Sequence, residues 1–161
     1  MAPDAAGLDK AARLIKSGSV VAMPTETVYG LAADAFNATA CARVFEIKAR
    51  PSFDPLIVHL AESAWLGRVA ESNPLADRLA RAFWPGPLTL VLPRRPEVPG
   101  IVTSGLDTVA VRVPAHPVAL ALLRLVDRPL AAPSANRFGA LSPTRSEHVE
   151  RGLGSRVACV L

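Results

Sequence analysis

Short apolar segments alternate with helix-forming stretches along most of this chain, and that alternation restricts the folds open to it. Apolar runs typical of buried strands occupy residues 20–23, 56–60, 88–92 and 129–132. Residues 108–113 instead alternate in period two, which places three valines on one face and Arg112 on the other. Strands that alternate with helices are typical of a layered α/β fold. We therefore predict a single α/β domain that covers residues 1–161.

Apolar spacing of three and four residues predicts the helices between these strands. The expected helices cover residues 8–16, 61–70, 74–82, 117–125 and 145–152. Gly18 is expected to close the first helix, and either Asn37 or Thr39 to cap a helix that runs to about residue 48. A last strand is expected over residues 156–161. Because that apolar strand has no closing turn, we expect a domain that is truncated at its C-terminus.

Composition excludes several classes of protein. Half of the 161 residues are hydrophobic but only 5% are aromatic, which suits packed helix and sheet layers and excludes a disordered or collagen-like chain. Cys41 and Cys159 show no metal-type spacing, so we expect a reducing, cytoplasmic setting. Asp4 and Asp9 precede any apolar run, which argues against a secretory signal. No charge-free apolar run approaches the roughly 20 residues that span a bilayer, so we expect no membrane partner.

The formal net charge is +4, and its distribution is uneven. Residues 81–161 hold ten Lys and Arg against five Asp and Glu, whereas residues 1–80 hold eight against nine. Such an excess suits a polyanion such as ATP or tRNA, but it equally suits a solvated surface. Charge alone favours neither interpretation.

Familiar catalytic motifs are absent from the sequence. There is no phosphate loop of the G-x-x-x-x-G-K-[ST] type, no G-x-G-x-x-G fingerprint, no H-E-x-x-H and no nucleophile elbow. A chain that handles ATP without them needs another arrangement of phosphate-binding groups.

Two polar segments near strand ends are candidates for that arrangement. Thr25, Glu26 and Thr27 follow the first strand, where ligand sites of α/β sheets usually lie, although such threonines also cap helices. Lys48 and Arg50 form a pair of cations suited to phosphate or carboxylate, although a helix C-terminus favours cations anyway. By default His59, at the end of an apolar strand, is a satisfied structural histidine.

Two further candidate segments lie later in the chain. Arg112 sits between valines, so a buried side chain needs a carboxylate partner or an anionic ligand, and an exposed one needs neither. Ser134, Asn136 and Ser142 could grip phosphate, ribose or a base edge, but loops rich in Ser, Asn and Pro are also ordinary turns.

Taken together, these segments resemble the YrdC-like family of threonylcarbamoyl-AMP synthases. The matching stretches are PTETVYGLAADA (24–35), KARP…DPLIVH (48–59), FWPGPLTLVL (83–92), TVAVRVPAHP (108–117) and PLAAPSAN…LSPT (129–144). Their order and spacing hold from about Gly18 to Val149.

The resemblance implies a YrdC/RibB-like α/β domain of three layers, with a twisted mixed sheet and a deep basic site. It implies an L-threonylcarbamoyladenylate synthase, a nucleotidyltransferase that uses L-threonine, bicarbonate and ATP. N-carboxylated threonine would attack the α-phosphate of ATP and release pyrophosphate. A downstream transferase complex would then move the threonylcarbamoyl group to N6 of adenosine 37 in tRNA. Mg²⁺ would enter with the ATP, and no protein metal ligand is implied.

The resemblance also assigns roles to individual residues. The expected threonine-binding residues are Thr27, His59, Arg112 and Ala132. The expected nucleotide-binding residues are Arg50, Asp54, Thr108, Ser134, Asn136 and Ser142. The expected catalytic pair is Lys48 and Arg50, which would face the phosphates or carbonate.

The chain departs from the family pattern in three places. Asp54 stands where Asn is usual, and Arg137-Phe138-Gly139 replaces the usual x-Ser-Gly. The family also continues past Leu161 into a strand and loop that close the site.

Two other functional hypotheses stay open. The first is an RNA-binding YrdC-like module for tRNA or double-stranded RNA, with Arg94, Arg95, Arg124 and Arg128 as phosphate contacts. The second is a catalytically weakened paralogue, which includes a carbamoyl-chemistry domain like that of hydrogenase maturation proteins.

Overall fold

The computed structural model describes residues 1–49, 51 and 53–161. Its α-helices are α1 (Ala5–Lys16), α2 (Ala38–Lys48), α3 (Pro74–Phe83), α4 (Pro117–Val126) and α5 (Ser146–Leu153). Two 3-10 helices, η1 (Ser63–Arg68) and η2 (Gly154–Arg156), complete the helical elements of the described residues. The strands are β1 (Val21–Met23), β2 (Gly30–Asp34), β3 (Ile57–His59), β4 (Leu90–Pro93), β5 (Thr108–Arg112), β6 (Leu130–Ala131) and β7 (Cys159–Val160).

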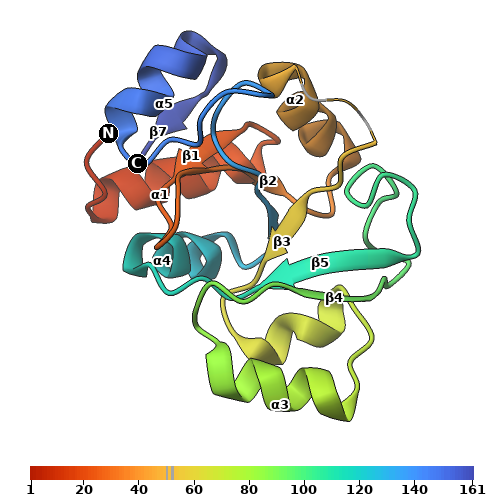
Figure 1. Cartoon of the computed structure of the whole chain (residues 1–161). Helices are drawn as coiled ribbons and strands as arrows, with labels where there is room; N and C mark the ends of the chain where they lie inside the picture. The colour runs from red at the N-terminus through yellow and green to blue at the C-terminus, as the bar shows by residue number, and fades with distance from the viewer. Residues whose placement is uncertain (50, 52) are drawn as a thin grey trace.

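These strands form one mixed sheet in the order β4-β5-β3-β6-β2-β1-β7 (Figure 1). The pairs β3–β5 and β1–β7 are parallel, and the other neighbours are antiparallel. The predicted α/β class with a mixed sheet is therefore confirmed.

Register in the centre of the sheet places two candidate side chains together. His59 on β3 lies beside Arg112 on β5, because Ile57 pairs with Ala110 and the two strands run in parallel. Ala132 follows β6, and its N–H donates to the carbonyl of Ile57 at 2.9 Å. Residues that are far apart in the sequence therefore meet around the end of β3.

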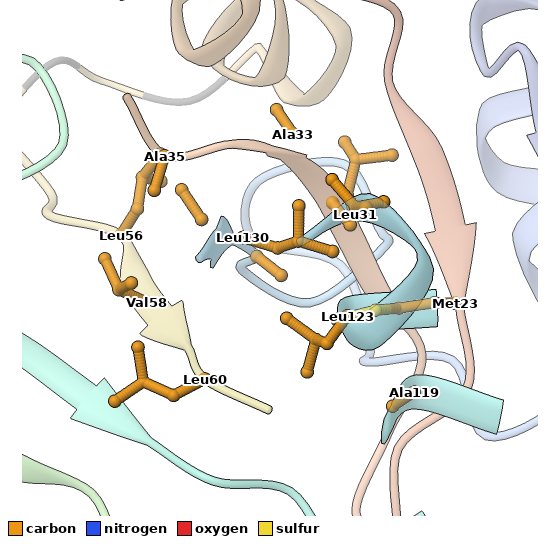
Figure 2. Close-up of a cluster of buried hydrophobic side chains, with 14 of the residues drawn as sticks. Met23, Leu31, Ala33, Ala35, Leu56, Val58, Leu60, Ala119, Leu123 and Leu130 are labelled. Carbon is orange, nitrogen blue, oxygen red and sulfur yellow. The ribbon is translucent and has the colours of Figure 1, made fainter. Parts of the chain in front are cut away.

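One cluster of the buried core lies on one face of β3, against α4 (Figure 2). Leu56, Val58 and Leu60 point into this apolar cluster, together with Leu123 of α4. Successive side chains of a strand point to opposite faces, so Ile57 and His59 point the other way. The core face anchors β3 and leaves its opposite face for the candidate site.

Local side-chain and backbone features explain where α2 and α4 begin and where α1 ends. The Asn37 side chain accepts a hydrogen bond from the N–H of Ala40 at 3.0 Å and so caps α2. At α4, His116 Nδ1 accepts from the N–H of Val118 at 3.3 Å, and Pro117 occupies the first turn. Gly18, with φ of +85°, follows the end of α1 as expected.

Three expectations about elements were wrong in part. Strand β2 was not anticipated, because four of the five residues of its sequence, GLAAD, are Gly, Ala or Asp, which have low strand propensity. It forms because β1 and β6 pair on its two sides and bury every residue of it. The stretch 61–70 forms only the short 3-10 helix η1, and the last strand is limited to Cys159–Val160. Among the described residues, every helix is too short or too polar to cross a bilayer.

Candidate functional site

A cavity of about 380 Å³ opens on the face of β3 opposite to the cluster of Figure 2, and we call it Cavity A. Its lining comes from the loop after β1, from β3 and the residues before it, from β5, and from the loop after β6. The lining residues are Thr25, Thr27, Val28, Gly30, Asp54, Pro55, Ile57, His59, Arg112, Ala132, Pro133 and Ser134. All four residues expected around threonine therefore line one cavity, together with Asp54 and Ser134.

The loop after β1 is held in shape by Thr25. Its hydroxyl donates to the carbonyl of Val28 at 2.6 Å and accepts from the N–H groups of Thr27 and Val28, at 3.3 Å each. The two threonine hydroxyls lie 3.0 Å apart. This local bonding is the turn chemistry expected of threonine, and it directs the Thr27 hydroxyl toward Arg112.

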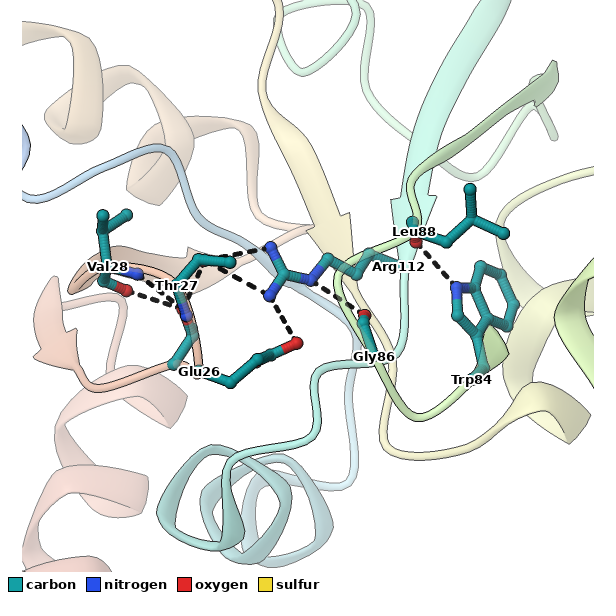
Figure 3. A network of polar contacts seen from close by, with 8 residues as sticks. Glu26, Thr27, Val28, Trp84, Gly86, Leu88 and Arg112 are labelled. Carbon is teal, nitrogen blue, oxygen red and sulfur yellow. Dashed lines mark hydrogen bonds and ion pairs between the residues drawn. The ribbon is translucent and has the colours of Figure 1, made fainter. Parts of the chain in front are cut away.

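Arg112 is buried, with 7% of its surface exposed, and its guanidinium is held from two sides (Figure 3). Nη2 lies 2.6 Å from Glu26 Oε1, and both Nη1 and Nη2 lie 3.3 Å from the Thr27 hydroxyl. From the other side, Nε donates to the carbonyl of Gly86 at 3.2 Å. Of the readings left open by the sequence, the structure supports a buried arginine with a carboxylate partner.

His59 is 4% exposed, and its environment favours the neutral ring. Burial, followed by the charge of Arg112, lowers its pKa to about 4. Its Nδ1 lies 3.2 Å from the carbonyl of Ile57. His59 is therefore both a satisfied buried histidine and a neutral part of the Cavity A wall.

Lys48 ends α2 and is almost completely buried, at 1% exposure. Its ammonium donates to the carbonyl of Ser134 and, at 2.6 Å, to the carbonyl of Asn136. The carbonyl of Lys48 in turn accepts from the N–H of Phe138 at 2.8 Å. Lys48 thus fastens the loop after β6 to the end of α2.

A second cavity of about 500 Å³ lies beyond that loop, and we call it Cavity B. Its lining combines three basic side chains with hydroxyl, amide and apolar groups. The lining residues are Asn136, Arg137, Ala140, Leu141, Ser142, Pro143, Thr144, His148, Arg151 and Gly152. Asn136 Oδ1 is buried and has no hydrogen-bond partner among the residues that the structure describes, and Leu141 is 95% exposed.

The residues expected around the nucleotide are divided between several places. Asp54 and Ser134 line Cavity A, whereas Asn136 and Ser142 line Cavity B. Thr108 is exposed at the start of β5, opposite Pro93 of β4, and lines neither cavity. Arg50 lies outside the described residues.

Glu26 and Gly86 contact Arg112. The sequence placed Glu26 in a candidate segment but did not pair it with Arg112, and Gly86 was not a candidate. The signal for Glu26 was present, because a cation between valines needs a carboxylate if it is buried. No sequence rule pointed to Gly86, since its role depends on a backbone carbonyl. Its position is also tight, as a Cβ there would lie 2.4 Å from the Phe83 carbonyl oxygen.

The four arginines of the RNA-binding hypothesis are not equally available. Arg128 is paired with Asp34 at 2.9 Å, and Arg94 donates to the carbonyl of Val98 at 2.6 Å. Arg95 and Arg124 are exposed. Engaged side chains lose part of their capacity for phosphate, so this arrangement offers limited support for RNA binding.

Neither metal ligation nor thiol chemistry stands out in the part of the chain that the structure describes. There, no three His, Cys, Asp or Glu side chains come together as a metal site. Cys41 and Cys159 are both free thiols. Burial raises the pKa of Cys41 to about 12, so this thiol is a poor nucleophile.

Comparison with known proteins gives a consistent result over nearly the whole chain. A family model that combines Sua5, YciO and YrdC, described as "Telomere recombination", matches residues 13–161. A threonylcarbamoyl-AMP synthase from Pyrococcus abyssi is 51% identical over 152 residues, which cover 94% of this chain and 45% of that protein. A second threonylcarbamoyl-AMP synthase, from Bacillus subtilis, is 49% identical over 154 residues, which cover 94% of this chain and 44% of the B. subtilis protein.

A solved structure agrees with the sequence comparison. The crystal structure of P. abyssi Sua5 complexed with L-threonine matches with a TM-score of 0.93 and 51% identity. The match covers 95% of this chain and 45% of that one. The chain therefore spans about half the length of these relatives.

Proposed function

Because the chain belongs to the Sua5, YciO and YrdC family, we propose that it acts as an L-threonylcarbamoyladenylate synthase. The reaction would join L-threonine, bicarbonate and ATP into threonylcarbamoyl-AMP, with release of pyrophosphate and water. The observation that carries this proposal is Cavity A, where a buried arginine, a neutral histidine and a threonine hydroxyl converge.

Threonine would bind in Cavity A through its carboxylate. Arg112 supports this assignment because a fixed guanidinium in a buried wall attracts a carboxylate strongly. Thr27 adds a hydroxyl, and neutral His59 adds a polar group without a second positive charge. The small side chain of Ala132 would leave room for the substrate. The P. abyssi structure with bound L-threonine supports the same choice of ligand.

ATP would extend from Cavity A into Cavity B. Ser134 lines one cavity and Asn136 the other, so a nucleotide that crosses their shared loop could contact both. The volume of Cavity B, about 500 Å³, is within the range of small-ligand pockets. Its wall offers Ser142 for ribose or base and Arg137 and Arg151 for phosphate.

Lys48 would support this nucleotide through the loop that it fastens. Its bonds to the carbonyls of Ser134 and Asn136 favour a positioning role over the direct phosphate contact expected from the sequence. Arg50 remains part of the proposal as the cation for the reacting phosphates. Thr108 lines neither cavity, so its position gives no support to a place beside the nucleotide.

The proposed reaction requires no nucleophilic side chain from the protein. The carboxylated threonine is itself the nucleophile, so binding two anions side by side and stabilising charge on the α-phosphate would suffice. Mg²⁺ bound to ATP would neutralise phosphate charge during the reaction. Asp54 has the oxygen ligands that Mg²⁺ prefers and lines Cavity A, so it is the residue that would hold the ion.

Release of pyrophosphate tests the proposal directly. The chain should release pyrophosphate from ATP and Mg²⁺ only when threonine and bicarbonate are both present. Arg112→Ala should abolish the threonine-dependent release, and Arg156→Ala, which removes an exposed arginine that lines neither cavity, serves as the charge-matched control. Pyrophosphate release that continues without threonine would contradict the assignment.

The proposal also covers the cellular location of the protein and the partner that receives its product. We expect a cytoplasmic protein, consistent with its two free thiols, whose product passes to a threonylcarbamoyl transferase complex acting on tRNA. A catalytically weakened paralogue would bind threonine and ATP but release little pyrophosphate. Direct binding measurements therefore accompany the activity assay.

A further inference from the structure

Arg112 is anchored by groups that come from two loops on opposite sides of it (Figure 3). The loop after β1 supplies the Glu26 carboxylate at 2.6 Å and the Thr27 hydroxyl at 3.3 Å. The loop before β4 supplies the carbonyl of Gly86 at 3.2 Å. Thr27 lines Cavity A, whereas Glu26 does not. Glu26 therefore reaches Arg112 without being a wall of the cavity.

We propose that Glu26 is a positioning residue, which holds the Arg112 guanidinium in the orientation that receives the substrate carboxylate. This inference rests on the proposed function, since it concerns the threonine end of the same site. Glu26 would act through Arg112 and not by touching the substrate. The sequence offered Glu26 only as one of three polar residues that could contact a ligand directly, which differs from a role through Arg112.

The number of donors on Arg112 explains why orientation matters. A guanidinium carries five N–H groups. The contacts within the described residues use Nε, one N–H of Nη1 and both N–H groups of Nη2. One N–H on Nη1 is then left for a ligand in Cavity A. A single donor binds well only if it points in one direction, so the group that fixes the guanidinium controls the affinity for the carboxylate.

The negative charge of Glu26 also compensates the buried positive charge of Arg112. A buried cation without a partner is costly, and the pair with Glu26 allows Arg112 to stay buried before any substrate arrives. Burial tends to raise the pKa of Glu26, but the hydrogen bond and charge of Arg112 and nearby backbone N–H groups outweigh it and lower the pKa overall. Glu26 is thus an anion throughout the neutral range, and the guanidinium is preorganised.

A positioning role differs from a merely structural one in what it changes. Loss of a structural contact would lower stability and reduce binding of both substrates together. Loss of orientation at Arg112 should weaken threonine binding and leave nucleotide binding nearly unchanged, because Arg112 lines Cavity A and no described residue lines both cavities. The ratio of the two affinities is therefore the informative measurement.

The test compares three variants of the whole chain by calorimetric titration with L-threonine and, separately, with ATP and Mg²⁺. Glu26→Ala should weaken threonine binding by about tenfold or more, since it removes the carboxylate partner of a buried arginine. Glu26→Gln keeps an oxygen that accepts from Nη2, so it should recover part of the loss. Glu62→Ala, which removes an exposed carboxylate with no capping hydrogen bond, should bind both ligands like the unmodified chain.

The possible outcomes separate this inference from the function on which it rests. If the unmodified chain binds threonine and Glu26→Ala binds it equally well, the positioning role is overturned and the proposed function stands. An equal loss of threonine and ATP binding in both Glu26 variants also overturns it, in favour of a structural role. If the unmodified chain does not bind threonine, the proposed function is overturned and this inference with it.

Discussion

At the scale of single residues, the site is built from groups whose charge is controlled by burial. The charge of Arg112 is paired with the Glu26 carboxylate, and His59 stays neutral because burial and Arg112 both lower its pKa. Lys48 has its ammonium on backbone carbonyls. Each of these side chains is therefore held by protein groups before any ligand binds.

The role of Lys48 can be tested by two substitutions. Lys48→Met should weaken ATP binding by about tenfold and lower stability, because the two carbonyls lose their donor, at a cost of about 1–3 kcal/mol for each unsatisfied group. Lys48→Arg should not restore binding, since a larger group does not fit a site that is 1% exposed. Calorimetry with ATP and thermal unfolding would measure both effects. Full ATP affinity in Lys48→Arg would instead indicate a direct phosphate contact.

The lowered pKa of His59 predicts how stability depends on pH. The unfolded chain takes up a proton on this ring below about pH 6.5, whereas the folded protein does so only near pH 4. The free energy of unfolding should therefore fall as the pH drops from about 6.5 toward 4, because the unfolded state binds more protons there. Urea unfolding of the wild type and of His59→Gln at pH 7 and pH 5 would check this. The variant should lose less stability between the two values, and an equal loss would contradict the assignment.

At the scale of elements, local sequence signals place helices well and short strands poorly. The N-terminal caps at Asn37 and Asn73 and the prolines at the starts of α3 and α4 act as their residue types predict. Strand β2 escaped prediction, because its Gly and Ala residues become a strand only through pairing with β1 and β6. Likewise η1 is a 3-10 helix over a stretch whose apolar residues suggested an α-helix.

The cap of α2 offers an element-scale prediction with a built-in control. The sequence allowed either Asn37 or Thr39, and the structure has Asn37 as the cap. Asn37→Ala should lower the free energy of unfolding by about 1 kcal/mol, because the N–H of Ala40 loses its acceptor. Thr39→Ala, at an exposed helical position, should change it little. Chemical denaturation of both variants would decide between the two residues.

At the scale of the whole molecule, one mixed sheet connects regions that lie far apart in the sequence (Figure 1). The N-terminal amine bonds to the carbonyl of Val160 at 2.7 Å, and Arg112 meets Thr27 across 85 positions of sequence. The strands that carry Cavity A on one face bury the apolar cluster on the other. Stability of the core and geometry of the site should therefore depend on each other.

A core substitution tests this coupling and the expectation of a single domain. Leu123 of α4 is fully buried in the cluster of Figure 2, so Leu123→Ala should cost about 2–5 kcal/mol. Leu125 on the same helix is 40% exposed, and Leu125→Ala should have a small effect. Far-UV circular dichroism and tryptophan fluorescence should report one coincident unfolding transition in each protein. Two separate transitions would contradict the single-domain expectation.

Much of this protein followed from the sequence by itself. Apolar periodicity, caps and prolines determined most helices and the central strands, because these signals act within a few residues of one another. The polar segments identified as candidates contribute most of the lining of Cavity A, since side chains at strand ends are brought to one place by the sheet. The family resemblance could also be read from the sequence, because it rests on continuous stretches of residues.

Only the tertiary structure decided which groups each of those residues contacts and which cavity it lines. It paired Arg112 with Glu26 and Gly86, turned Lys48 toward backbone carbonyls, separated Asn136 and Ser142 from Cavity A, and left Thr108 outside both cavities. These outcomes depend on strand register and burial, which bring together groups that are far apart in the sequence and fix which of them share a face. The arginine that the sequence left with three possible environments acquired its carboxylate partner only when the sheet formed.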